Sequence, residues 1–219
     1  MILLLLLFLF ISSFALFIAS RHDFVLLRQN ISIRLVFDRA FIIVIAALFI
    51  SRIFYLLDQR MFDFFLDPLR FMHVILYYGF DIFGFVCTLS LGVAIFFRKR
   101  KNVLRVLDIY LLSFFPLVIF QNIVSFINSS FDPVVGGISI AAAAFAFILF
   151  IIMHNKFGVR DGVVSFLIII FSALAYLFTS FYVKHEVALF SVVQIAALIA
   201  IAISIYCLVL VRLNFFKEK

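Results

Sequence analysis

The sequence predicts an all-α polytopic membrane protein, one domain over residues 1–219, with seven transmembrane helices, the N-terminus outside and the C-terminus cytoplasmic. Hydrophobic residues make up 68% of the chain and charged residues only 13%, and the mean hydropathy is +1.33. A soluble domain of this length would be much more polar. Isolated charges also divide the apolar sequence into pieces of roughly 17 to 27 residues, long enough to cross a hydrocarbon core of about 30 Å as helices. Strands of a membrane barrel would need an alternating pattern, which these pieces lack.

The seven predicted spans are separated by short polar connections. The first span could be mistaken for a secretory signal, but Arg21, Arg28 and Arg34 follow its apolar run, whereas a signal peptide carries its positive charge in front. We therefore expect this span to be retained. The spans cover roughly residues 2–19, 36–57, 71–97, 103–127, 137–153, 163–183 and 187–211.

The second span begins with a pair of charged residues, Asp38 and Arg39. At a helix end, a long charged side chain can extend to the membrane surface, and a charged side chain of either length can pair with a neighbour of opposite charge. Arg105 and Asp108 are expected at a matching depth on the fourth span, so they are candidate partners for this pair. We therefore predict that these charged residues stabilise the fold and do not form a functional site.

Four polar side chains are predicted to converge in the outer half of the membrane. Arg52 lies about 8 Å and Asp81 about 15 Å below the outer surface at the helical rise, and Asn122 and Gln194 lie at intermediate depths. A polar side chain in a bilayer is costly unless it faces the protein interior. Two interpretations follow: an ion pair between Arg52 and Asp81 ringed by amides, or a binding site for a lipid head group.

The fifth and sixth spans carry small and hydroxyl-bearing side chains. Four consecutive alanines, Ala141 to Ala144, suit close packing between helices. Tyr176, Thr179 and Ser180 on the sixth span have hydroxyls that can bond the preceding turn of their own helix. The alanines are therefore predicted to pack against a neighbouring helix, and the hydroxyls to form hydrogen bonds within their own helix.

The distribution of basic residues predicts the orientation of the spans. Only Arg60, Arg70 and Lys184 fall on the side that also holds the N-terminus. Because cytoplasmic connections carry the excess of lysine and arginine, the more basic side is the cytoplasmic one. The residues on that side are Arg21, Arg28, Arg34, Arg98, Lys99, Arg100, Lys101, Arg105, Lys156, Arg160, Arg212, Lys217 and Lys219.

The charge and the motifs of the sequence also indicate which partners and cofactors to expect. The net charge of +7 is explained by topology and by contact with anionic head groups, so no nucleic-acid partner is expected. The four histidines, His22, His73, His154 and His185, show no spacing that would hold a metal ion. No phosphate-binding loop, dinucleotide glycine pattern or nucleophile elbow occurs. We therefore predict neither a metal nor a cofactor.

Several polar segments occur in a recognisable order. The second span ends in Ser51-Arg52-Ile53-Phe54-Tyr55, the third contains Tyr78-Gly79-Phe80-Asp81-Ile82-Phe83-Gly84, and the fourth ends in Gln121-Asn122-Ile123-Val124-Ser125-Phe126-Ile127-Asn128. Leu104-Arg105-Val106-Leu107-Asp108 and Val193-Gln194-Ile195 complete the series. In this order the chain resembles the prolipoprotein diacylglyceryl transferase family, whose corresponding motifs are G-A-R-L-F-Y, G-G-x-S-F-H-G-G, G-R-I-G-N-F-x-N-G-E, R-x-L-D and G-Q-L.

The resemblance implies a seven-span protein of the bacterial cytoplasmic (inner) membrane. Members of that family move a diacylglyceryl group from phosphatidylglycerol to the cysteine thiol of a lipoprotein precursor. For this chain, it implies an anionic phospholipid and a lipoprotein precursor or another membrane protein as partners. It also implies a set of residues that bind the lipid head group: Arg52, Tyr55, Asn122, Asn128 and Gln194.

The chain departs from the family where the chemistry is expected. Phe83 occupies the family's histidine position, Asn122 its signature arginine, Ser125 its asparagine and Ser130 its glutamate. Activation of a thiol and departure of a glycerol phosphate suit a base and cationic groups. A fold can persist without the chemistry that relatives carry on it.

Three hypotheses follow. The first is a catalytically silent member that binds phospholipid or lipopeptide, or acts as an assembly subunit in lipoprotein biogenesis. The alternative is an active, divergent transferase in which Asp81 is the catalytic base and Arg52 and Tyr55 hold the head group. The third is a small transporter, which the lack of broken helices in paired halves disfavours.

Overall fold

The computed structural model shows a bundle of α-helices. It describes residues 2–23, 26, 31–58, 80–98, 102–127, 133–156, 160–184 and 191–217. Within these ranges the regular structure is helical, without strands. The helices are α1 (Ile2–His22), α3 (Ile33–Asp58), α5 (Ile82–Phe97), α6 (Val103–Phe114), α7 (Pro116–Ile127), α8 (Pro133–Lys156), α9 (Val163–Lys184) and α10 (Val192–Lys217).

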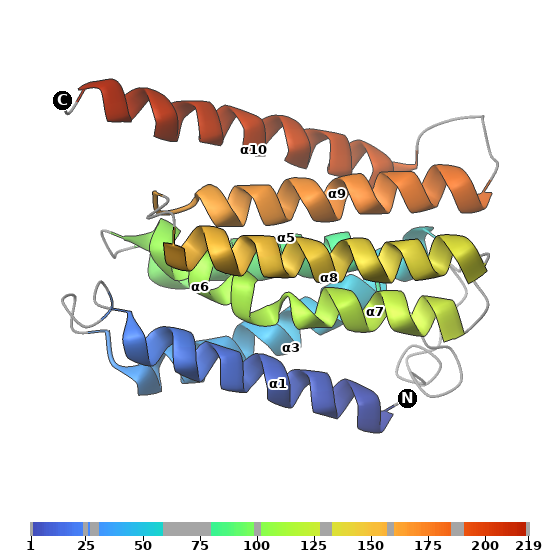
Figure 1. The fold of residues 1–219 in the computed structure, drawn as a ribbon, viewed down its shortest axis with the longest axis horizontal. Coiled ribbons are helices and arrows are strands. Elements are labelled where there is room, and N and C mark those ends of the chain that lie inside the picture. The colour runs from blue at the N-terminus through green and yellow to red at the C-terminus, as the bar shows by residue number, and fades with distance from the viewer. Residues whose placement is uncertain are drawn as a thin grey trace.

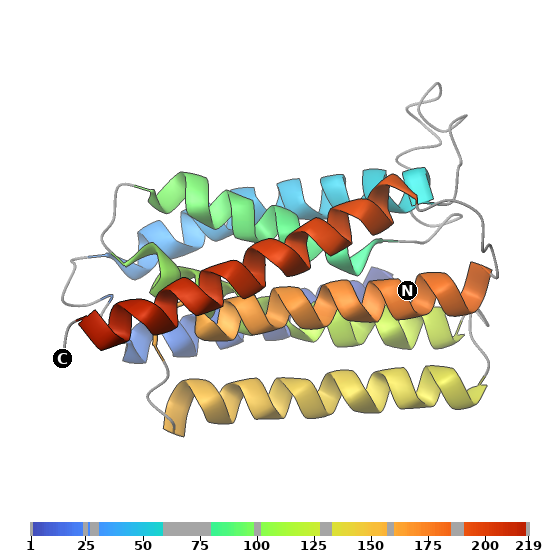
Figure 2. The ribbon, with the colours of Figure 1, turned by 90° about the horizontal axis from the view of Figure 1, so that it is seen from above.

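The helices lie roughly along one long axis, and the two chain termini lie at opposite ends of the bundle (Figure 1). We call the end that holds the start of α1 the N-end, and the end that holds the last turns of α10 the C-end. The N-end also holds the end of α3 and the start of α5, and the C-end holds the starts of α6 and α9. Seen from above, α8 lies at one side of the bundle and α3 and α5 at the other (Figure 2).

Five helices are long and apolar enough to cross a membrane. They coincide with the second, fourth, fifth, sixth and seventh predicted spans: Ile33–Asp58, Val103–Val124, Val134–His154, Val163–Phe181 and Val192–Val211. Two shorter apolar helices, Leu5–Arg21 and Ile82–Phe97, accompany them. The structure thus confirms an all-helical chain with the helices of a multi-pass membrane protein.

The third predicted span begins later than expected. The prediction began it at residue 71, whereas helix α5 begins at Ile82 and Asp81 stands before it with extended backbone dihedrals (φ −90°, ψ 120°). Residues 71–79 lie outside the described ranges. The prediction counted Asp81 as a polar residue inside a helix, but its carboxylate accepts a hydrogen bond from the Gly84 N–H and so caps the helix.

The fourth predicted span is broken in its middle. Helix α6 ends at Phe114 and α7 begins at Pro116, with Phe115 between them. Proline has no N–H to donate and its ring crowds the preceding turn, so a helix bends or stops at it. The backbone tightens instead: Phe115 N donates to Leu112 O at 3.4 Å and Val118 N donates to Phe115 O at 2.8 Å.

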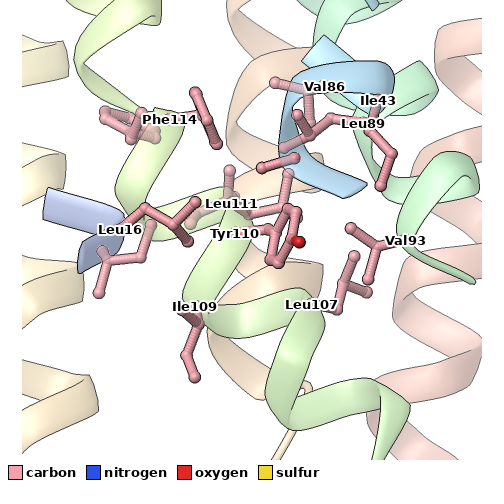
Figure 3. Packing of buried hydrophobic residues seen from close by; sticks show 14 of the residues in the cluster. Leu16, Ile43, Val86, Leu89, Val93, Leu107, Ile109, Tyr110, Leu111 and Phe114 are labelled. Atoms are coloured by element: carbon pink, nitrogen blue, oxygen red, sulfur yellow. The ribbon is translucent and has the colours of Figure 1, made fainter. Parts of the chain in front are cut away.

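Helix α6 occupies the middle of the bundle and contacts α1, α5 and α9. In the apolar 18-residue stretch of Val103–Val124, 78% is buried, against 22% in that of Val134–His154 at the periphery. Figure 3 shows Leu107, Ile109, Tyr110 and Leu111 of α6 among side chains from neighbouring helices. The Tyr110 hydroxyl donates to Val36 O of α3 at 2.6 Å, which satisfies a polar group in an otherwise apolar core.

Helices α3 and α5 approach closely because α5 carries two glycines on the contact face. A Cβ on Gly92 would lie 2.7 Å from Ile43 Cγ2, and a Cβ on Gly84 would lie 2.8 Å from Phe54 Cγ. Neither contact leaves room for a methyl group. Small residues of this kind let helix backbones approach within a membrane.

Candidate functional site

A polar cavity opens at the N-end of the bundle, and we call it the N-end pocket. Its volume is about 120 Å³, which suits a head-group fragment better than a whole lipid. It is lined by residues from α3, α5, α7 and α9 and from the approach to α5. These are Asp58, Phe80, Asp81, Ile82, Gln121, Asn122, Ala175, Tyr176 and Thr179.

Asp81 lies at the junction of α3 and α5, on one wall of this pocket. Its backbone N–H donates to Ser51 O of α3 at 3.1 Å, and its side chain caps α5 through Gly84 N. The residue is 8% exposed. Asp81 therefore presents a carboxylate whose position is fixed by two backbone contacts.

Tyr176 also lines this pocket, and its ring belongs to an aromatic cluster. Tyr176 of α9 donates its hydroxyl to Asp58 Oδ1 at 2.7 Å, joining α9 to the end of α3. The Phe83 ring stacks on Tyr176 with centroids 5.9 Å apart and meets Phe54 edge to face at 6.4 Å. Phe83 is thus a buried ring in an aromatic cluster.

Arg52 and Tyr55, which the resemblance assigns to the head group, lie one turn apart on α3. The Arg52 side chain is buried, with 2% exposed, and its guanidinium lies 5.4 Å from the centre of the Tyr55 ring. Such a cation over an aromatic face is favourable, and more so where water is excluded. Neither residue is among those that line the described part of the N-end pocket.

Gln194 forms a capping box at the start of α10. Its N–H donates to Ser191 Oγ at 3.2 Å, while its own Oε1 accepts from Ser191 N at 2.8 Å. Its amide nitrogen donates to Ser180 Oγ of α9 at 2.7 Å. The side chain therefore fastens the start of α10 to α9, and the sequence signature S-x-x-Q could have indicated this use.

The structure brings two of the predicted polar residues together. Asp81 and Asn122 share the N-end pocket with Gln121, and Asp58 and Tyr176 complete it. Asn128 lies outside the described residues. Asp58 was not singled out in the sequence because an acidic residue at a span end is ordinary, and its partner Tyr176 is distant in sequence.

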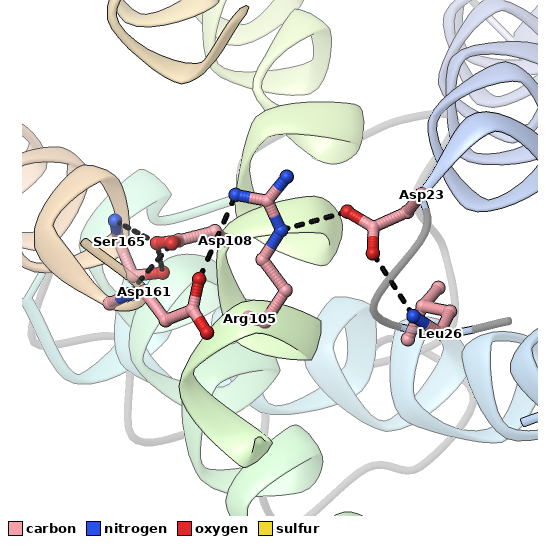
Figure 4. Close-up of polar contacts among 7 residues, drawn as sticks. Asp23, Leu26, Arg105, Asp108, Asp161 and Ser165 are labelled. Atoms are coloured by element: carbon pink, nitrogen blue, oxygen red, sulfur yellow. Dashed lines mark hydrogen bonds and ion pairs between the residues drawn. The ribbon is translucent and has the colours of Figure 1, made fainter. Parts of the chain in front are cut away.

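A second group of charged residues lies at the C-end, centred on Arg105 of α6 (Figure 4). Arg105 Nε donates to Asp23 Oδ2 at 2.7 Å, and Arg105 Nη1 lies 3.8 Å from Asp161 Oδ1. Burial raises the pKa of Asp161, while the Arg105 charge acts in the opposite direction. Arg105 therefore joins the end of α1 to the turn before α9.

Asp108, one turn further along α6, caps α9 from outside that helix. Its Oδ2 accepts from Gly162 N at 2.7 Å, and its Oδ1 accepts from Ser165 N at 2.8 Å and from the Ser165 hydroxyl. Gly162 has φ +92°, a conformation that favours glycine. Asp108 is 1% exposed, and these donors satisfy both of its buried carboxylate oxygens.

The predicted pairing of Asp38 and Arg39 with Arg105 and Asp108 is wrong. Asp38 lies 3.9 Å from Arg34 on the surface of α3. Arg39 donates to Phe96 O and lies 4.7 Å from the centre of the Phe97 ring. Asp38 therefore interacts with its own helix, α3, and Arg39 interacts with the end of α5.

Among the described residues, no group of three or more His, Cys, Asp or Glu side chains is placed to hold a metal ion. Comparison with protein-family models, with curated proteins and with solved structures finds no match. The fold and the polar clusters define an all-helical protein with the helices of a multi-pass membrane protein.

Proposed function

We propose that this chain is a seven-span membrane protein, related in fold to the prolipoprotein diacylglyceryl transferases, that binds the polar end of a phospholipid or lipopeptide without transferring it. The N-end pocket is the observation that carries the proposal. Two carboxylates, two amides and two hydroxyls line one small cavity at the end of an apolar bundle. A polar cavity of this kind in a membrane protein is costly to keep and indicates a functional site.

The chemistry of the lining favours a head group rich in hydroxyls. Asp58 and Asp81 can accept hydrogen bonds, and the amides of Gln121 and Asn122 can both donate and accept. The glycerol of phosphatidylglycerol supplies hydroxyl donors that match these acceptors. The lipid phosphate would lie toward the amides and away from the carboxylates, because like charges repel.

In this proposal the N-end faces outward and the C-end faces the cytoplasm of a bacterium. Support comes from basic residues near the helix ends. Among the described residues, those at the C-end include Arg98, Arg105 and Arg160. The excess of basic residues on one side is typical of the cytoplasmic face. The two shorter apolar helices, α1 and α5, complete the seven spans in this arrangement.

We propose that the chain lacks transfer activity because the side chains around the pocket include no suitable catalytic base. The Phe83 ring packs between Phe54 and Tyr176 and cannot accept a proton. The Asp81 carboxylate accepts a hydrogen bond from the Gly84 N–H and is already engaged as the cap of α5. Neither group supplies the activated base that a thiol attack needs.

The proposal is tested by the lipids that remain on the purified protein. Protein extracted in mild detergent is analysed by mass spectrometry, comparing the natural chain with Asn122→Leu. We expect phosphatidylglycerol to be retained by the natural chain and reduced about tenfold in the variant, which corresponds to about 1.4 kcal/mol. Asn102→Leu, the same change at the C-end, is the control and should retain the lipid.

Equal retention by all three proteins would overturn the proposed pocket. A separate assay addresses catalysis: membranes in which this chain is the only candidate transferase are supplied with phosphatidylglycerol and a lipoprotein precursor. We expect no diacylglyceryl-modified precursor. Modification that disappears in Asp81→Asn would instead show the chain to be an active, divergent transferase.

A further inference from the structure

A second cavity lies at the C-end, on the flank of the bundle between α1, α6 and α8, and we call it the C-end slot. Its volume is about 460 Å³, within the range of sites that hold small organic ligands. The lining is apolar along most of its length and polar at one end. It consists of Ala15, Ile18, Ala19, Asp23, Arg105, Leu112, Ser113, Phe147, Ile151 and His154.

The slot is elongated along the helices. Arg105 and Ser113 both line it and lie eight positions apart on α6, about 12 Å at the helical rise. On α8, His154 and Phe147 line it at a separation of about 10 Å. Asp23, Arg105 and His154 thus form the mouth near the C-end, and Ser113 and Phe147 form the deep end.

The slot opens on a surface that suits lipid. Ile18 in its wall is 45% exposed, and Phe14 beside it on α1 is 57% exposed. On α8, Leu149 is 44% exposed and Ile152 39%. In a membrane these side chains face acyl chains, so a lipid can enter the slot sideways without crossing a polar barrier.

The deep end carries a buried hydroxyl. Ser113 is 2% exposed, and its Oγ has no hydrogen-bond partner among the residues that the structure describes. A buried hydroxyl without a partner costs about 1 to 3 kcal/mol. An occupant that places a carbonyl or a trapped water at this depth would remove that cost.

The mouth carries both signs of charge. Arg105 Nε binds Asp23, and Arg105 Nη1 faces Asp161, while the remaining nitrogen, Nη2, points away from both carboxylates (Figure 4). Asp23 is the carboxylate that lines the mouth, and Arg105 is its guanidinium, so the mouth offers one group of each sign to a head group. A zwitterion matches the mouth, with its phosphate toward Arg105 Nη2 and His154 and its ammonium toward Asp23.

We propose that the C-end slot binds a zwitterionic aminophospholipid of the phosphatidylethanolamine type. One acyl chain lies along Ala15, Ile18, Phe147 and Ile151, and the head group lies at Asp23, Arg105 and His154. This site is distinct from the N-end pocket, and its test does not depend on that pocket.

The natural chain contains no tryptophan, so a single introduced tryptophan reports on the slot alone. Phe147→Trp places the probe in the deep part of the slot. Purified protein in detergent receives a few equivalents of phosphatidylethanolamine or phosphatidylglycerol with brominated acyl chains, which quench nearby indole fluorescence. We expect phosphatidylethanolamine to halve the emission at the lower lipid ratio, and phosphatidylglycerol to have a several-fold weaker effect.

Four variants control this experiment. Ala19→Phe in the Phe147→Trp background fills the slot and should abolish quenching, and Ala15→Leu is a milder filling variant if the first does not fold. Ala141→Phe, on an exposed face of α8, should leave quenching unchanged. Phe145→Trp, at a position 68% exposed, shows the quenching caused by lipid bound elsewhere.

The outcomes that overturn the proposal are distinct. Quenching of the Phe147→Trp probe by aqueous iodide but not by brominated lipid would show a slot filled by water only. Quenching that survives both filling variants would place the lipid outside the slot. Equal quenching by the two lipids would overturn the assignment of a zwitterionic head group.

Discussion

Asp108 of α6 and Ser165 of α9 are joined by two hydrogen bonds, in which one carboxylate oxygen accepts from both the backbone N–H and the hydroxyl of the serine. The other oxygen accepts from Gly162 N. A helix N-terminus leaves several N–H groups without partners, and a side chain of the same segment usually supplies the acceptor. Here the acceptor comes from the central helix, so the start of α9 and the middle of the bundle are held together.

Replacing this carboxylate should destabilise the protein. Asp108→Ala leaves Gly162 N and Ser165 N buried without an acceptor, which should lower the free energy of unfolding by about 2 to 4 kcal/mol. Asp38→Ala removes an aspartate whose side chain is 68% exposed and should cost less than about 0.5 kcal/mol. Thermal unfolding in detergent, followed by circular dichroism, measures both. Equal midpoints for the two variants would contradict this role of Asp108.

The ion pair between Arg105 and Asp23 should show energetic coupling. The two side chains are 20% and 4% exposed, so water screens the pair less than it would on a surface. A double-mutant cycle with Arg105→Gln and Asp23→Asn should give a coupling of about 1 kcal/mol. Arg34 and Asp38, 91% and 68% exposed and 3.9 Å apart, provide the comparison pair, for which about 0.3 kcal/mol is expected. A coupling at Arg105 no larger than at Arg34 would argue against the bridging role.

The two capping contacts of Gln194 predict an effect on stability without an effect on lipid. Gln194→Ala removes the acceptor for Ser191 N and the donor to Ser180, and should cost about 1 to 2 kcal/mol. Gln194→Glu keeps the acceptor and should recover part of the loss. Mass spectrometry of lipids bound to the folded variants should show the same phospholipid content as the natural protein. Loss of phospholipid from Gln194→Ala would restore the head-group role implied by the resemblance.

The close contact of α3 and α5 predicts opposite effects for two glycine substitutions. Gly92→Ala forces a methyl group against Ile43, and overpacking of this kind costs about 1 to 3 kcal/mol. A Cβ added to Gly137 of α8 would meet no atom within 4 Å among the described residues, so Gly137→Ala should stabilise the helix by about 0.5 to 1 kcal/mol. A midpoint that does not fall for Gly92→Ala would contradict the packing at Gly92, and one that falls for Gly137→Ala would contradict the open space at Gly137.

The sequence contains enough to predict much of this fold. Apolar length and composition identify the helices of a membrane protein, and five of the predicted spans agree with helices long and apolar enough to cross a bilayer. Two local signals modify this hydropathy pattern. Pro116 marks the break in the fourth span, and Asp81 three positions before Gly84 has the spacing of a helix cap.

The sequence predicted the polar sites less well than it predicted the helices. Gln194 was assigned to a head group although Ser191-Val192-Val193-Gln194 has the pattern of a capping box. The C-end slot could not be predicted, because Asp23, Ser113 and His154 lie far apart in sequence and no pattern relates them. Which polar residues meet depends on how the helices pack, and the hydropathy of each helix does not determine this.

The buried position of Asp108 has a consequence for biogenesis. Its acceptor oxygens are satisfied by Gly162 and Ser165, whose backbone lies 54 and 57 positions later in the chain. At a synthesis rate of about 5 to 20 residues per second, those donors emerge several seconds after Asp108. A lone carboxylate is costly inside a bilayer, so we expect the central helix to reach its final position only once α9 has arrived. We therefore expect the insertion of the central helix to depend on a later helix and not to proceed strictly in chain order.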